Sequence, residues 1–73
     1  MEKNQIAQRV RAFRKLKGFT QDELAQRMGV SIAVLGAIER GSRKAEAKMI
    51  EKIAAALHID PLELSPVLKE GER

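Results

Sequence analysis

The segment 20–41 constrains the fold of this 73-residue chain more than any other part of it. Thr20 is followed three residues later by Glu23, the spacing of a capping box at the start of a helix. Gly29 can adopt the positive φ of a tight turn without the steric cost of a Cβ atom. Ser31 then provides a second N-cap. The segment therefore predicts two short helices joined by a tight turn, which is the layout of a helix-turn-helix.

The rest of the chain predicts further helices and no strands. Apolar residues recur at helical spacing in the N-terminal part, where the expected buried stripe is Ile6, Val10, Phe13 and Leu16. Asp60, Pro61 and Glu63 have the pattern of an N-cap, first turn and third helical position. We expect helices over about residues 4–17, 21–28, 32–40, 45–57 and 61–64. The predicted fold is all-α, with one compact domain at 1–66 and a tail at 67–73.

Composition narrows the class of protein. The chain has no cysteine and one histidine, so a His/Cys metal cluster cannot form within it. We recognise no phosphate loop, nucleophile elbow or catalytic triad, so we expect neither an enzyme nor a cofactor. No apolar run approaches the ~18 residues of a membrane span, and we expect a cytoplasmic protein. The net charge of +4 is compatible with a nucleic-acid partner without establishing one.

The run GFTQDELAQRMGVS, with the later segments IERG and MIEKIAAAL, resembles the Cro/repressor-type helix-turn-helix family of bacterial and phage regulators, also called the xenobiotic-response-element family. The resemblance extends from about Ile6 to Leu64. It implies a five-helix fold that binds duplex DNA as a dimer, with the second helix of the motif in the major groove. It also implies a partly buried ion pair between Arg14 and Glu39.

Phosphate contacts are expected at both ends of the motif. Gln21 stands at the first position of its helix, where a side chain and a backbone N–H can reach a phosphate oxygen. The full set of expected phosphate-binding residues is Thr20, Gln21, Arg40, Arg43 and Lys44. The cations of the first helix, at positions 9, 11, 14, 15 and 17, spread around its circumference and are interpreted mainly as a solvated face.

The face expected to meet the bases is unusually apolar. It comprises Ser31, Ile32, Ala33, Val34, Gly36 and Ala37. Only Ser31 can form a side-chain hydrogen bond, and its hydroxyl is expected to cap the helix. Three interpretations remain open: apolar contacts with thymine methyl groups, readout of DNA shape with close approach at Gly36 and Ala37, or docking of a protein.

The C-terminal region carries more apolar residues than a short segment needs for one core. We expect a dimer interface formed by Ile59, Leu62, Leu64, Val67 and Leu68, although packing onto the chain's own helices is the alternative. The predicted function is a sequence-specific regulator of transcription, more often a repressor, bound as a homodimer to a near-palindromic operator. No small-molecule ligand is expected, and regulation by a protein partner is compatible with the sequence. The alternative function is a protein-interaction module, resembling an antitoxin or anti-repressor partner.

Overall fold

The computed structural model describes residues 2–65, with side chains from residue 5 onward. Five α-helices make up the secondary structure of this range, and no strand occurs within it. They are α1 (Glu2–Leu16), α2 (Gln21–Met28), α3 (Ile32–Arg40), α4 (Ala47–Leu57) and α5 (Pro61–Leu64). The predicted all-α, five-helix fold is confirmed.

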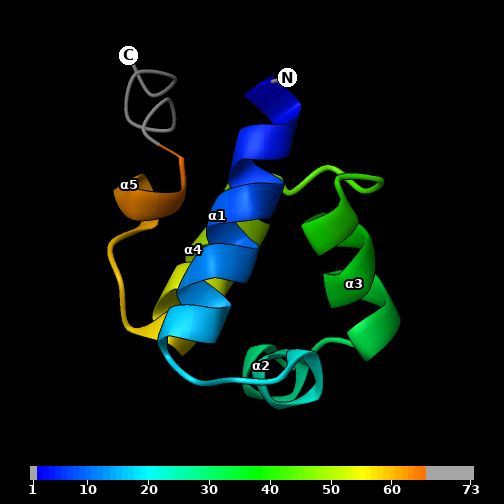
Figure 1. The fold of residues 1–73 in the computed structure, drawn as a ribbon, viewed down its shortest axis with the longest axis vertical. Helices are drawn as coiled ribbons and strands as arrows, with labels where there is room; N and C mark the ends of the chain where they lie inside the picture. The colour runs from blue at the N-terminus through cyan, green and yellow to red at the C-terminus, as the bar shows by residue number, and fades with distance from the viewer. Residues whose placement is uncertain (1, 66–73) are drawn as a thin grey trace.

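All five helices contribute to one core. Helices α1 and α4 contact each other at the centre of the fold, with α3 on one side and α5 on the other (Figure 1). Helix α2 lies at one end and contacts both α3 and α4. Burial of one large apolar side chain contributes about 1.5–3 kcal/mol. The largest fully buried side chains are Val10, Leu24, Leu35, Ile38, Ile53, Leu57 and Leu64.

Local hydrogen bonds define the two helices of the motif. The Thr20 hydroxyl accepts from the backbone N–H of Glu23 at 3.1 Å, and the Glu23 carboxylate accepts from the backbone N–H of Thr20 at 2.9 Å. Gly29 has a φ of 74°, in the left-handed region. The Ser31 hydroxyl accepts from the backbone N–H of Val34 at 3.2 Å. The predicted capping box, turn and second N-cap are therefore confirmed.

Helix α1 differs from the prediction in its bounds and in its buried face. It runs from Glu2 to Leu16, whereas residues 4–17 were expected. Leu16 is 76% exposed, so its expected place in the buried stripe is wrong. Successive steps of three residues drift around a helix of 3.6 residues per turn, and Leu16 lies at the edge of the stripe. Ala7, which the pattern did not include, is buried instead.

The ends of α4 and α5 have different capping chemistry. Helix α4 begins at Ala47 rather than at Ala45, which is buried but precedes the helix. The N-cap residue Glu46 forms no capping hydrogen bond with its side chain. His58 ends α4 in the left-handed region with a φ of 60°. The Asp60 carboxylate caps α5 as predicted, by accepting from the backbone N–H of Leu62 at 2.9 Å.

Candidate nucleic-acid interface

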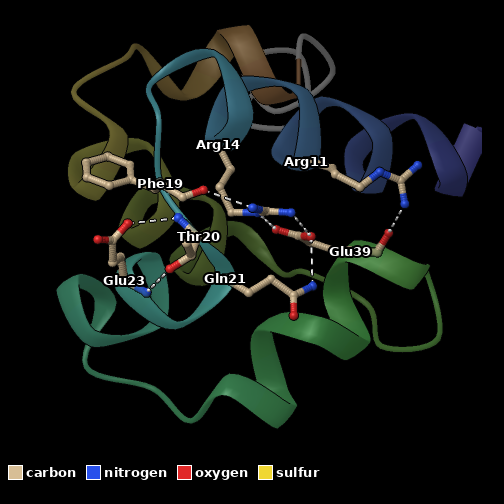
Figure 2. Close-up of polar contacts among 7 residues, drawn as sticks. All are labelled: Arg11, Arg14, Phe19, Thr20, Gln21, Glu23 and Glu39. Carbon is tan, nitrogen blue, oxygen red and sulfur yellow. Dashed lines mark hydrogen bonds and ion pairs between the residues drawn. The ribbon is translucent and has the colours of Figure 1, made fainter.

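A buried carboxylate joins helices α1, α2 and α3. Glu39 of α3 is buried, and its two carboxylate oxygens accept from Arg14 of α1: Nε donates at 2.6 Å and Nη2 at 3.1 Å. The Gln21 amide at the start of α2 donates to the same carboxylate at 3.0 Å. The remaining nitrogen of the guanidinium, Nη1, donates to the backbone carbonyl of Phe19 at 2.9 Å (Figure 2). The network fixes the orientation of α3 relative to both helices that precede it.

Two further arginines of α1 donate to backbone carbonyls near helix ends. Arg11 Nη1 lies 3.4 Å from the carbonyl oxygen of Glu39, in the last turn of α3 (Figure 2). Arg9 Nη1 donates to the carbonyl oxygen of Glu63, in α5, at 3.1 Å. A cation at a helix C-terminus interacts favourably with the carbonyl groups that the helix leaves free. The ion pair between Arg14 and Glu39 that the family resemblance implied is confirmed. Arg9 and Arg11, interpreted as part of a solvated face, each donate in addition to one backbone carbonyl, and Arg11 is still exposed.

The expected phosphate contacts at the start of α2 have their side chains engaged within the chain. The Thr20 hydroxyl serves the capping box, and the Gln21 amide is half-buried against Glu39. The geometry of a helix start leaves the backbone N–H of Gln21 without an acceptor inside the helix. This N–H is therefore a donor that the fold itself does not use.

Helix α3 presents a small apolar surface to solvent. Ile32 is 47% exposed, and Ala33 is exposed, whereas Val34 and Ala37 are half-buried. Gly36 is buried, which corrects the expectation that it lies on the exposed face. The Ser31 hydroxyl accepts the capping hydrogen bond, so its single O–H donor is the uncharged side-chain hydrogen-bonding group left at the start of α3.

Three cations follow this apolar surface along the chain. Arg40, at the end of α3, is exposed, as are Arg43 and Lys44 in the connection to α4. Within residues 5–65 the ion pair between Arg14 and Glu39 is the only salt bridge, so none of these three cations is paired there. Their positive charge is available to a polyanion.

The residues expected at a dimer interface fall into three groups. Leu62 is 36% exposed, and Ile59 is half-buried against the core. Leu64 is fully buried inside the chain, so its expected place at a subunit interface is wrong: it fills the core between α5 and its neighbours. Val67, Leu68 and the predicted boundary at residue 66 lie outside the described residues.

Two other kinds of site have no support in the part of the chain that the structure describes. No helix there has the length and apolar character to cross a bilayer. No group of three or more His, Asp or Glu residues there is arranged to hold a metal ion.

Comparison with known proteins points to one class. The sequence pattern of the HTH_3 helix-turn-helix family matches residues 10–64. The chain is 47% identical over 66 residues to the uncharacterized HTH-type transcriptional regulator YazB of Bacillus subtilis, which covers 90% of this chain and 96% of YazB. It is 36% identical to the HTH-type transcriptional regulator SinR of the same organism, over 74% of this chain and 50% of SinR. The crystal structure of the restriction-modification controller protein C.AhdI of Aeromonas hydrophila superposes with a TM-score of 0.83 at 38% identity, covering 86% of this chain and 96% of C.AhdI.

Proposed function

Because this chain belongs to the HTH_3 helix-turn-helix family of DNA-binding transcriptional regulators, we propose that it represses transcription by binding a specific duplex DNA site as a homodimer. The observation that carries the proposal is the way in which side chains of α1 and α2 bind Glu39 and so orient α3. The Arg14–Glu39 pair and Gln21 link this helix to α1 and α2, while its outer face remains in solvent and unpaired cations follow it. A helix that is already oriented can enter the major groove without a loss of conformational entropy on binding.

Phosphate binding is assigned to groups on both sides of α3. Arg43 and Lys44 are exposed and lie just beyond the helix, where they can reach a DNA backbone. At the start of α2, the backbone N–H of Gln21 is the donor we assign to a phosphate oxygen, since its side chain is engaged with Glu39. Each neutralised phosphate releases counterions, so binding should weaken steeply as salt rises.

Among the three interpretations of base recognition, exposure favours thymine methyl contacts. Ile32 and Ala33 are the exposed apolar side chains at the start of α3, where helix-turn-helix proteins reach base edges. Close approach of the DNA to bare backbone at Gly36 is disfavoured because this residue is covered. We therefore propose that Ile32 and Ala33 contact thymine methyl groups.

A homodimer would place two copies of α3 about 34 Å apart on a near-palindromic site. We assign the contact between subunits to the surface around Leu62, which α5 leaves partly exposed. Occupation of such a site beside a promoter by a cytoplasmic dimer would block transcription. Leu64 has no part in this contact, since it is used by the core.

Selection of bound duplexes from a random pool, followed by gel shifts of the selected duplex at increasing salt, tests this function. We expect one enriched, near-palindromic sequence that is bound in the presence of competitor DNA at about 150 mM salt. Weak binding without sequence enrichment would contradict the proposal and favour a protein-interaction module. A reporter gene placed behind the selected site then distinguishes repression from activation.

A further inference from the structure

Gly36 occupies a place where its lack of a side chain is not explained by backbone conformation. It lies in the middle of α3, in regular helical geometry. A glycine inside a helix costs about 1 kcal/mol relative to alanine. The glycine is also covered, so it does not offer bare backbone to a ligand. The reason for it must be sought in the atoms that cover it.

Two polar side chains fill the space that a side chain at position 36 would take. A Cβ atom built on Gly36 would lie 3.2 Å from Arg40 Nη1, closer than Cβ contacts ordinarily are. It would also lie 3.8 Å from Gln21 Oε1 and 3.9 Å from Gln21 Nε2. The guanidinium of Arg40 and the amide of Gln21 therefore both rest against this one position of α3.

This placement moves the charge of Arg40 away from the end of the helix. Residues at i and i+4 share one face, and helical side chains lean toward the N-terminus. Arg40 follows this rule, so its guanidinium lies one turn back, over the middle of α3 rather than beyond its end. The nearest buried carboxylate, Glu39, is already bound by Arg14 and Gln21. Arg40 forms no ion pair with any described residue.

We propose that Gly36 is a positioning residue that seats the Arg40 guanidinium on the outer face of α3, where Arg40 recognises a guanine in the major groove. The inference rests on the proposed DNA-binding function. A guanidinium presents a planar fork of donors that matches the O6 and N7 acceptors of guanine. It supplies the forked pair of donors that the start of α3 lacks, because Ser31 offers there only a single O–H donor. Arg40, which was expected from the sequence to bind phosphate, thereby has a different role from Arg43 and Lys44, which we assign to phosphates.

The test compares the selected duplex with one in which each guanine in turn is replaced by 7-deazaguanine, which removes only the N7 acceptor. For the wild-type chain, we expect one guanine per half-site whose replacement weakens binding about tenfold. Arg40→Lys keeps the charge and loses the fork, so it should bind the two duplexes within about threefold of each other. Arg27→Lys, an exposed arginine of α2 outside the interface, should keep the tenfold preference.

Gly36→Ala tests whether Gly36 positions the Arg40 guanidinium. The alanine raises helix propensity, and the group it displaces is the flexible end of Arg40, so thermal stability should stay equal or rise. The guanine preference should nevertheless fall at least about threefold, since binding groups must be held within about 0.5 Å of their working geometry. Full preference in Gly36→Ala would overturn the positioning role, and full preference in Arg40→Lys would overturn guanine recognition by Arg40. A wild-type chain that selects no sequence would instead refute the proposed function.

Discussion

Arg14 and Glu39 form the polar link between the first helix and the helix assigned to the major groove. The two side chains meet through two hydrogen bonds, with the arginine 11% exposed and the carboxylate 2% exposed. Removal of one partner from such a pair costs more than the pair itself contributes, because the other charge stays buried without compensation. Each residue is therefore needed to compensate the charge of the other, and the pair as a whole is not a large source of stability.

Arg14→Met should lower the free energy of unfolding by about 3 kcal/mol, because the buried Glu39 carboxylate would keep the Gln21 amide as its single hydrogen-bond donor. Arg11 contacts the backbone carbonyl of Glu39 and does not replace the lost charge. The double variant Arg14→Met/Glu39→Leu should be more stable than Arg14→Met alone. Urea denaturation of the two single variants and the double variant measures this coupling. Additive losses in the double variant would show that the two residues act independently.

Thr20→Ala should lower the free energy of unfolding by about 1 kcal/mol through loss of the cap at the start of α2. Thr20→Ser retains the hydroxyl and is the matched control, which should stay near the wild-type value. Thermal and urea unfolding give the comparison. An equal loss in both variants would assign the effect to the threonine methyl group instead of the capping hydrogen bond.

Exposed and buried leucines should differ sharply, although the helical pattern of the sequence gives Leu16 and Leu24 the same interpretation. Leu16→Ala should change the free energy of unfolding by less than about 0.5 kcal/mol, since the side chain is 76% exposed. Leu24→Ala should cost about 2–5 kcal/mol, since its side chain is fully buried. A large loss for Leu16→Ala, measured by urea denaturation, would mean that another surface covers this residue in solution.

The features predicted correctly from the sequence depend on residues close together in the chain. Caps at Thr20, Ser31 and Asp60 and the turn at Gly29 are chemistry within four residues, and the structure has all of them. The class of fold follows from these signals together with the helical spacing of apolar residues. The prediction that Leu16 is buried was wrong because helical periodicity identifies the apolar face of α1 but does not show how much of that face the other helices cover.

The features that were missed depend on which helices meet. Arg9 and Arg11 look like solvated cations until the ends of α5 and α3 lie beside α1. Gly36 looks like exposed backbone until Gln21, fifteen residues earlier in the chain, packs over it. Leu64 looks like surplus apolar surface until α5 folds against α1 and α4. The identity of these residues is local information, whereas their roles are set by tertiary packing.

Salt dependence should separate the cations that touch phosphate from those that merely add charge. Arg43→Ala/Lys44→Ala should reduce the slope of log K against log salt by about 3.6 for the bound dimer, the contribution of two phosphate contacts from each subunit. Lys48→Ala/Lys52→Ala removes the same net charge from exposed positions on α4, and should leave the slope unchanged. Equal changes in the two double variants, measured by gel shift on the selected duplex, would refute phosphate contacts by Arg43 and Lys44.

Leu62 should control assembly of the proposed homodimer without controlling the fold. The side chain is 36% exposed, so Leu62→Glu leaves the core intact while it places a charge in the proposed contact. We expect the Kd of the dimer to rise at least about tenfold, with the free energy of unfolding of the monomer nearly unchanged. Leu16→Glu is the matched control, because it introduces the same charge at an exposed leucine in the last turn of α1. Sedimentation equilibrium over a range of protein concentrations measures the Kd of the dimer, and urea denaturation measures the free energy of unfolding. An equal Kd of the dimer for the wild type and for Leu62→Glu would show that Leu62 lies outside the interface, because burial of an unpaired carboxylate between subunits would weaken dimerisation.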